Sequence, residues 1–224
     1  MNYHAIAIDG PSGAGKSTVA RALAQKLQFI YIDTGAMYRA IGVYVAEKGV
    51  DTKDWEAVPA LLPEIKLELC FVDGTQHILV NGADVSGAIR TENASMYASN
   101  VSAIPAVRTF LLDFQRSFAK QNHVIMDGRD IGTVVLPDAD LKIFLTASAE
   151  ARAKRRFLEQ QQKGEPVTFE QVLEALKKRD LQDSTRAAAP LKPAEDAILV
   201  DTTELDFQQT VTHILEIVQE KLCV

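Results

Sequence analysis

A glycine-rich stretch close to the amino terminus matches the pattern G-x-x-x-x-G-K-S/T, which is called the P-loop, at residues 10–17. Glycine at positions 10, 13 and 15 lets backbone N–H groups turn inward and approach the oxygens of a bound phosphate. Apolar residues 5–9 precede the loop as a strand would, and residues 16–27 follow it with apolar side chains at helical spacing. This context predicts a parallel α/β fold in which the helix N-terminus helps to hold an anion.

The alternative for this stretch is a chance glycine-rich turn, and the strand before it and the helix after it favour the P-loop. We therefore expect a nucleoside triphosphate here, with Lys16 at its β- and γ-phosphates and the Ser17 hydroxyl on Mg²⁺. The residues expected to bind ATP are Gly10, Pro11, Ser12, Gly13, Ala14, Gly15, Lys16, Ser17 and Thr18.

The rest of the chain alternates short apolar runs with helical patterns. Continuous apolar runs are typical of parallel strands that are covered on both faces. We expect strands at residues 5–9, 29–32, 123–126, 141–145 and 197–200. We expect helices at residues 16–27, 36–46 and 149–162, another from the capping-box residues Thr168 and Gln171, and a last one from Asp206 to about residue 221.

One segment departs from this alternation. Residues 65–72 and 76–80 are rich in β-forming side chains and are separated by Asp73-Gly74, a pair typical of hairpin turns. We interpret residues from about 61 to 100 as a small insert on the parallel core, within a single domain that spans residues 1–224.

The charge and the apolar pattern exclude several classes of partner. The chain has 24 Lys+Arg against 30 Asp+Glu, a net charge of −6, whereas proteins that bind nucleic-acid backbones are usually basic, so we expect no nucleic-acid partner. Its two cysteines and four histidines form no metal-binding pattern. We see neither a signal peptide nor a run of 18 apolar residues, and we expect a cytoplasmic monomer with no membrane contact.

The P-loop by itself does not define the reaction. A GTPase would need the base-reading pattern N-K-x-D, which is not in the sequence, and remodelling ATPases are usually larger. A kinase that passes a phosphoryl group to a small acceptor remains. A phosphorylated acceptor needs arginines to offset its repulsion from ATP. Arg39 and Arg129 follow predicted strands closely and so lie at the carboxyl edge of the sheet, where ligands bind, although surface ion pairs are the alternative.

Two further clusters of charged residues lie on predicted helices. Arg179, Asp183 and Arg186 are spaced i, i+4, i+7 and share one face if the helix persists to Ala187, although a solvated ion-pair ladder would show the same spacing. The basic stretch 152–156 precedes a break at Gly164-Glu165-Pro166. It is either a solvated face or, beside a P-loop, a mobile lid at residues of about 155–167.

Five segments together resemble the bacterial cytidylate kinase family, whose members phosphorylate CMP and dCMP with ATP: residues 8–17, 33–39, 84–91, 127–135 and 186–191. The resemblance covers nearly the whole chain. It implies a P-loop kinase core with a five-stranded parallel sheet flanked by helices, a short lid, and an α+β acceptor-side insert that matches residues 61–100.

The resemblance also implies roles for individual residues. The base would lie against Thr34, Ser99, Arg108 and Asp130, and the ribose against Arg179 and Asp183. The acceptor phosphate would be held by Arg39, Arg129 and Arg186. The transferring phosphoryl group would be served by Lys16, Arg155 and Arg156, so that the catalytic set is Lys16, Arg129, Arg155, Arg156 and Arg186.

Phosphoryl-transfer chemistry then determines the mechanism to expect. The acceptor phosphate is already ionised, so we assign no general base and expect catalysis from in-line positioning, Mg²⁺ and arginine charge. Two alternatives stay open: a P-loop kinase for another acceptor, such as UMP, dTMP, shikimate or dephospho-coenzyme A, and a non-catalytic nucleotide sensor.

Overall fold

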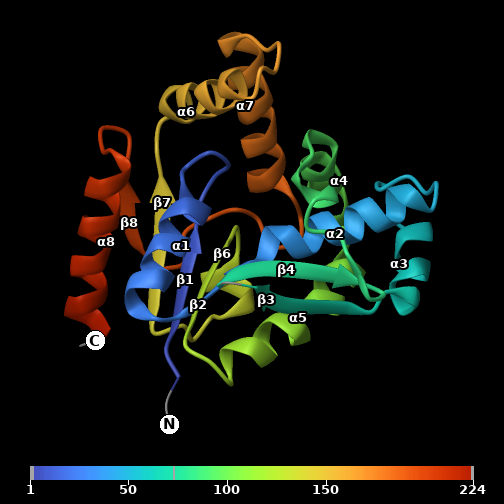
Figure 1. The fold of residues 1–224 in the computed structure, drawn as a ribbon, viewed down its shortest axis with the longest axis horizontal. Helices are drawn as coiled ribbons and strands as arrows, with labels where there is room; N and C mark the ends of the chain where they lie inside the picture. Colours follow the sequence, from blue (N-terminus) through green and yellow to red (C-terminus); the bar gives the residue numbers. More distant parts are fainter. Residues whose placement is uncertain (1–2, 73, 223–224) are drawn as a thin grey trace.

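A five-stranded, wholly parallel sheet forms the centre of the computed structural model, which describes residues 3–72 and 74–222 (Figure 1). Its strand order is β2-β6-β1-β7-β8. The strands are β1 (Ala5–Asp9), β2 (Ile30–Asp33), β6 (Val124–Gly128), β7 (Leu141–Thr146) and β8 (Ile198–Asp201). The predicted α/β fold and its parallel sheet are confirmed; β1 has the predicted boundaries, and those of the other strands differ from the predicted ones by at most two residues.

Helices cover the sheet on both faces, which explains why its strands are apolar throughout. The two faces are covered by α1 (Lys16–Leu27) with α8 (Phe207–Leu222), and by α2 (Thr34–Glu47) with α5 (Pro105–Ala119). In β1, Ile6 and Ile8 pack in the cluster with α1 and α8, whereas Ala7 packs in the cluster with α2 and α5. Successive strand residues point to opposite faces, so each β1 side chain between these helix layers is buried.

The predicted antiparallel hairpin is confirmed in β3 (Leu67–Val72) and β4 (Thr75–Val80), to which the short β5 (Ala83–Asp84) adds. Of the predicted turn, Asp73 lies outside the described residues. Ile78 and Val80 join the same apolar cluster as α2 and β6, and Gln76 accepts a hydrogen bond from the Asp33 backbone N–H at 2.8 Å. The hairpin therefore packs directly on the core beside β2.

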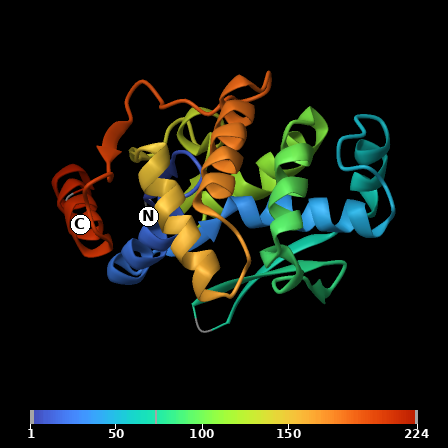
Figure 2. The same ribbon diagram turned by 90° about the horizontal axis from the view of Figure 1, so that it is seen from above.

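Short helices complete the segment between α2 and α5. They are α3 (Ala57–Leu61), two 3₁₀ turns at Leu62–Glu64 and Ala88–Arg90, and α4 (Glu92–Ser102), while a π-helical turn, Ile131–Val135, follows β6. The helix α4 packs against α2 and crosses it at a steep angle, as Figures 1 and 2 both show. None of the helices in the described part of the chain is long and apolar enough to cross a membrane.

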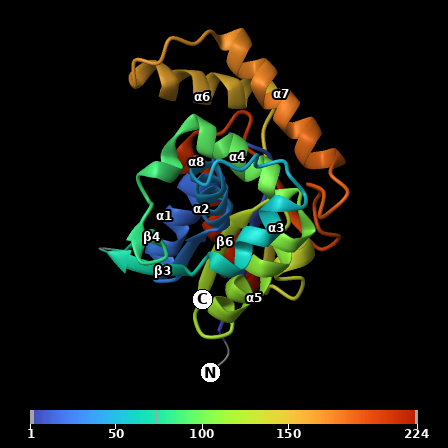
Figure 3. The same cartoon turned by 90° about the vertical axis from the view of Figure 1, so that its right-hand side faces the viewer.

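The helices α6 (Ala149–Gln162) and α7 (Phe169–Thr185) form a hairpin above the carboxyl edge of the sheet (Figure 3). Ala153, Val172 and Leu176 form an apolar cluster of their own between these two helices. The capping box predicted at the start of α7 is confirmed, because Thr168 and Gln171 exchange side-chain and backbone hydrogen bonds.

The condition under which Arg179, Asp183 and Arg186 would share one helix face, a helix that persists to Ala187, is not met. The helix ends at Thr185, and Arg186 has extended backbone angles, φ −62° and ψ 141°. The last turn is closed by other partners: the backbone N–H of Leu191 donates to the Asp183 carbonyl at 2.9 Å, and the Thr185 hydroxyl donates to the Leu181 carbonyl at 2.6 Å. Arg186 therefore extends from the loop after α7 and does not share a helix face with Arg179 and Asp183.

Close packing of α2 on α4 depends on Gly42, and this yields a first prediction. A Cβ atom at Gly42 would lie 2.6 Å from Tyr97 Cβ and 2.9 Å from its carbonyl carbon. Overpacking costs about 1–3 kcal/mol, and alanine recovers about 1 kcal/mol of helix propensity, so Gly42→Ala should lower the free energy of unfolding by up to about 2 kcal/mol in urea titrations.

Gly87→Ala is the matched control, because Gly87 has an ordinary φ of −75° and no atom within 4 Å of an added Cβ. Equal stability of the two variants would contradict this account of the α2–α4 contact.

Candidate active site

A cavity of about 520 Å³ lies at the carboxyl edge of the sheet, between the body of the protein and the α6–α7 hairpin. Most of the predicted site residues line it, although they come from seven separate segments of the chain: Ser12, Gly13, Gly15, Lys16, Ser17, Thr18, Thr34, Arg39, Ser99, Arg108, Arg129, Asp130, Arg155, Arg156, Arg179, Asp183 and Arg186. Gly10, Pro11 and Ala14 of the P-loop are buried and do not line the cavity.

The P-loop has the backbone that its glycines predict. Gly10, Gly13 and Gly15 have φ angles of 147°, 76° and 88°, and a Cβ at Gly10 would lie 1.9 Å from the carbonyl oxygen of Leu145. Lys16 is 6% exposed, and its Nζ donates to the Pro11 carbonyl at 2.7 Å. Burial, with the charge of Arg129 as a second cause, lowers the pKa of Lys16 to about 7.

A carboxylate that the sequence reasoning did not single out lies beside Ser17. Asp127 is the last but one residue of the buried strand β6 and accepts hydrogen bonds from Ser17 Oγ at 2.7 Å and from Tyr31 Oη at 2.9 Å. Burial raises the pKa of Asp127 to about 6. The signal for it was an acidic residue at the end of an apolar run on the strand next to the P-loop strand.

This donor set suits a magnesium ion. Mg²⁺ prefers oxygen ligands and is commonly held by one or two protein groups together with substrate phosphates. The hydroxyl of Ser17 and the carboxylate of Asp127 are such groups and are already in contact. Among residues 3–72 and 74–222 there is no group of three or more His, Cys, Asp or Glu side chains that could hold a metal, so phosphate oxygens would have to complete the coordination.

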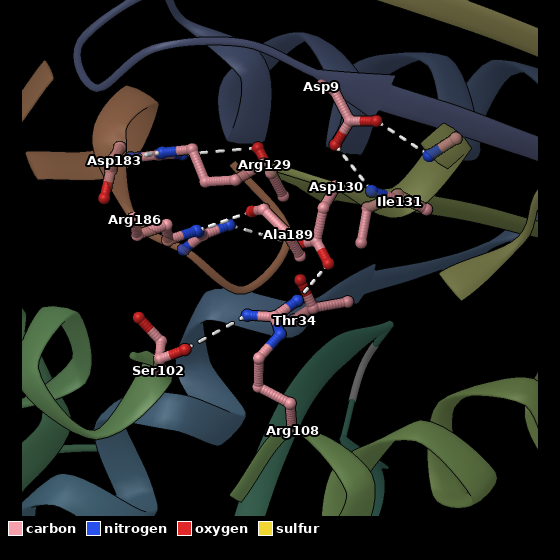
Figure 4. Close-up of polar contacts among 12 residues, drawn as sticks. Asp9, Thr34, Ser102, Arg108, Arg129, Asp130, Ile131, Asp183, Arg186 and Ala189 are labelled. Atoms are coloured by element: carbon pink, nitrogen blue, oxygen red, sulfur yellow. Dashed lines mark hydrogen bonds and ion pairs between the residues drawn. The ribbon is translucent and has the colours of Figure 1, made fainter. Parts of the chain in front are cut away.

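A second carboxylate outside the prediction, Asp9, supports the site from behind. It is 4% exposed and accepts the backbone N–H groups of Ile131 at 2.8 Å and Gly132 at 2.7 Å (Figure 4). Burial raises its pKa to about 6, in spite of these two hydrogen bonds. Asp9 therefore holds the π-helical turn that directly follows Arg129 and Asp130.

Asp130 lies between two arginines on the side of the cavity nearer α4 and α5. Its carboxylate is in contact with Arg108 of α5 and lies 3.5 Å from Arg186 Nη2 (Figure 4). Burial raises the pKa of Asp130 although both guanidinium groups oppose this. Arg186 Nε also donates to the Ala189 carbonyl at 2.6 Å.

Two hydroxyl groups lie on the same side of the cavity. Thr34 Oγ1 donates to the Asp127 carbonyl at 2.7 Å, which leaves it free only to accept a further hydrogen bond. Ser99 Oγ is buried and has no hydrogen-bond partner among the described residues. A buried hydroxyl without a partner is costly, so Ser99 is suited to bond a ligand in the cavity.

Three arginines, Arg39, Arg129 and Arg179, line the cavity between the P-loop and the residues around Asp130. Arg129 Nε donates to Asp183 Oδ2 at 2.8 Å, and Arg39 pairs with Asp33 at 2.8 Å. Arg179 Nε is buried without a partner in the described part of the chain, and burial lowers the pKa of Arg179 to about 10. Burial tends to raise the pKa of Asp183, but Arg129, Arg179 and Arg186 together outweigh it and the net shift is downward. The surplus of positive charge suits an anion.

The two arginines of the predicted lid, Arg155 and Arg156, differ in their present contacts. Arg156 is about 40% exposed and, among residues 3–72 and 74–222, pairs only with Glu159, at 3.2 Å, within its own helix. Arg155 donates to Thr202 Oγ1 at 3.1 Å and to the Leu205 carbonyl at 3.3 Å, which ties α6 to the loop between β8 and α8. To reach a phosphoryl group in the cavity, Arg155 would have to leave these partners.

The whole chain is similar in sequence to one family. Residues 6–220 match the family model described as cytidylate kinase. A cytidylate kinase from Caldicellulosiruptor saccharolyticus is 53% identical over 212 residues, covering 95% of this chain and 94% of the relative, and one from Pasteurella multocida is 45% identical over 221 residues, covering 99% and 97%. A solved structure of an uncharacterized protein from Eubacterium ventriosum shares the fold, with a TM-score of 0.52 and 15% identity over 97% of this chain and 98% of that one.

The low pKa of Lys16 gives a second prediction. At pH 8 a group with a pKa of about 7 is mostly neutral, and the negative charge of a bound triphosphate will raise that pKa, so binding must take up a proton. We expect an uptake of ~0.9 proton per site at pH 8 and almost none from this group at pH 6. Calorimetry of a nonhydrolysable ATP analogue in buffers of different ionisation enthalpy measures it.

Lys16→Met is the control for this measurement and should abolish the uptake at pH 8. Asp127, with a pKa of about 6, is already ionised there and contributes little. An equal uptake in the variant would contradict the assignment to Lys16.

Proposed function

The chain belongs to the cytidylate kinase family, and on that premise we propose that it transfers the γ-phosphoryl group of ATP to CMP or dCMP, giving ADP and CDP or dCDP. The observation that carries the proposal is the single cavity in which the P-loop lies opposite Asp130, Arg108 and the free hydroxyl of Ser99. One half is suited to a triphosphate and the other to a polar base.

The donor half is assigned to the P-loop, residues 10–18. Its backbone N–H groups and Lys16 would hold the triphosphate, and Ser17 with Asp127 would hold Mg²⁺. When bound, Mg²⁺ neutralises charge on the β- and γ-phosphates. The buried Lys16 would add its ammonium charge at the same atoms, because the triphosphate favours its protonated form.

The acceptor half is assigned by hydrogen-bond complementarity. Cytosine offers an amino donor at position 4 and acceptors at N3 and O2. The Asp130 carboxylate can only accept and suits the amino group, while the Arg108 guanidinium can only donate and suits N3 and O2. Ser99 and Thr34 would complete the contacts to the base, and Arg179 and Asp183 the contacts to the ribose.

The acceptor phosphate is assigned to Arg39, Arg129 and Arg186. The surplus charge around Arg129 supports an anion site at this point, as does the Arg179 Nε atom, which has no hydrogen-bond partner among the described residues. Arg186 now lies against Asp130, so its phosphate role requires it to exchange that contact on binding. The catalytic set proposed remains Lys16, Arg129, Arg155, Arg156 and Arg186.

The reaction needs no general base. An oxygen of the ionised acceptor phosphate attacks the γ-phosphorus in line, a new P–O bond forms, and the bond from the γ-phosphorus to the bridging oxygen of ADP breaks. Negative charge then moves toward that bridging oxygen. We assign the stabilisation of this charge to Lys16, Arg155 and Arg156. Each of these side chains would first have to leave its present partner in the protein.

We also propose roles for two segments outside the P-loop and an oligomeric state. Residues of about 155–167 would act as a lid and those of about 61–100 as the acceptor-side insert, within one domain. All the assigned residues come from one chain, which supports an active monomer. Its nucleotide substrates support a place in the cytoplasm.

Acceptor choice is the test of the proposed function. Uracil would set its O4 against the Asp130 carboxylate and its N3–H against Arg108, and buried mismatches of this kind cost about 10²–10⁴-fold in specificity. We expect kcat/KM for CMP and dCMP to exceed that for UMP by about 10²-fold or more, with AMP and GMP poorer still. ADP formation with ATP and Mg²⁺ across a panel of monophosphates measures this, and equal use of UMP and CMP would overturn the base assignment.

Replacing Asp130 gives a sharper prediction. Asp130→Asn keeps the size of the side chain but adds an amide donor that can serve uracil O4, so kcat/KM for CMP should fall by about 10²-fold and the gap to UMP should narrow. The KM for ATP is the internal control, because Asp130 lies on the acceptor side. If CMP and UMP activities fell equally, Asp130 would have no part in selecting the base.

A further inference from the structure

A buried arginine to which no role is yet assigned, Arg152 of α6, binds three separate parts of the chain. Its Nε donates to the Ala147 carbonyl at 2.9 Å, beyond the end of β7. Its Nη1 donates to the carbonyl of Ser12 in the P-loop at 2.9 Å, and its Nη2 lies 2.7 Å from Asp180 Oδ2 on α7. The Arg152 side chain is only 6% exposed.

The P-loop rests directly on this residue. A Cβ atom at Gly13 would lie 3.3 Å from Cβ of Arg152, so the loop backbone is in close contact with α6 at this point. The carbonyls of Pro11 and Ser12, the two residues before Gly13, are engaged, that of Pro11 by Lys16 and that of Ser12 by Arg152. These bonds hold the carbonyls while the loop N–H groups remain available to an anion.

The other end of the bridge lies beside the acceptor-side residues. Asp180 directly follows Arg179 and is three residues before Asp183, which receives the hydrogen bond of Arg129. The second oxygen of Asp180 is buried and has no hydrogen-bond partner in the described part of the chain. The Arg152–Asp180 pair thus joins the P-loop to the helix that carries Arg179 and Asp183.

We propose that Arg152 and Asp180 are positioning residues that couple occupancy of the P-loop to the placement of α7, and through α7 to the acceptor half of the cavity. The guanidinium group is planar with donors in fixed directions, so a shift of the loop changes where Asp180 can sit. A buried charge is costly without its partner, so the bridge resists opening at either end. This inference rests on the proposed function and deepens it.

Another ion pair between the same two helices provides a matched control. Glu150 of α6 and Lys177 of α7 are 3.3 Å apart, but both side chains are more than half exposed. Neither side chain lines the cavity. Removing this pair takes away an α6–α7 contact of the same kind without touching the bridge to the P-loop, and exposed pairs contribute little.

The first measurement is hydrogen exchange of α7 on binding of Mg²⁺ and AMP-PNP, a nonhydrolysable ATP analogue. In the wild type, occupancy of the P-loop should slow exchange in residues 169–185. In Asp180→Asn this protection of α7 should fall by about threefold or more while protection of the P-loop persists, and Glu150→Gln should match the wild type. Full protection of α7 in Asp180→Asn would overturn the proposal.

The second measurement is the affinity for CMP with and without AMP-PNP. Couplings between sites are reciprocal and are typically about 5–150-fold. We expect Asp180→Asn to bring the ratio of the two Kd values close to one while the Kd for CMP alone changes by less than about twofold, because the acceptor contacts themselves remain. A retained wild-type ratio, or no coupling in the wild type, would overturn the proposal.

A second variant guards against misfolding. Arg152→Lys keeps the positive charge next to Asp180 but replaces the planar fork by a point donor that cannot span all three acceptors. It should lose the coupling as Asp180→Asn does, and the double variant should lose no more than either single one. If the wild type makes no CDP from CMP, the proposed function fails, and the exchange measurement, which contains no acceptor, still tests the bridge.

Discussion

The parallel ladder between β1 and β6 brings the two halves of the cavity together. It pairs Ile8 with Asp127 and Asp9 with Gly128, so the P-loop leaves the sheet beside the segment that holds Arg129 and Asp130. Carboxyl ends of parallel strands meet at one edge, and a shift of one residue in this register would turn Asp127 away from Ser17. Asp9 adds to the same junction, because it bonds the turn after Asp130 from the strand that leads into the P-loop.

Burial of charged side chains at the carboxyl edge of the sheet costs free energy of folding. Desolvation lowers the pKa of Lys16 and of Arg179 and raises the pKa of Asp9, Asp127 and Asp130, so each of these groups is less stable in its charged form than it would be in water. A folded protein tolerates such groups where a ligand later supplies the missing charge or hydrogen bond. Triphosphate, metal ion and acceptor are the groups that the arrangement would accommodate.

The α6–α7 hairpin has the features of a unit that can move as one piece. Its apolar contacts are largely internal, through Ala153, Val172 and Leu176. Polar contacts connect it to the body, through Arg155 to the loop after β8 and through Arg152 to the P-loop. Directional polar contacts can be exchanged one at a time, whereas a shared apolar core would hold the hairpin in a single place. The hairpin is therefore positioned by a few identifiable side chains.

Local patterns in the sequence were sufficient for the parallel α/β fold, the P-loop, the β3–β4 hairpin and the capping box at Thr168, because each depends on residues close together in the chain. The strand ends also located Arg39 and Arg129, and the family resemblance added Ser99 and Arg108. Only the tertiary structure decided how these groups pair. The end of α7 before Arg186, the contact of Asp127 with Ser17 over 110 positions, and that of Arg152 with Ser12 over 140 positions depend on strand register and on how the hairpin packs. No short-range pattern in the sequence encodes such distances, because the partners meet only when the whole sheet and its helices are in place.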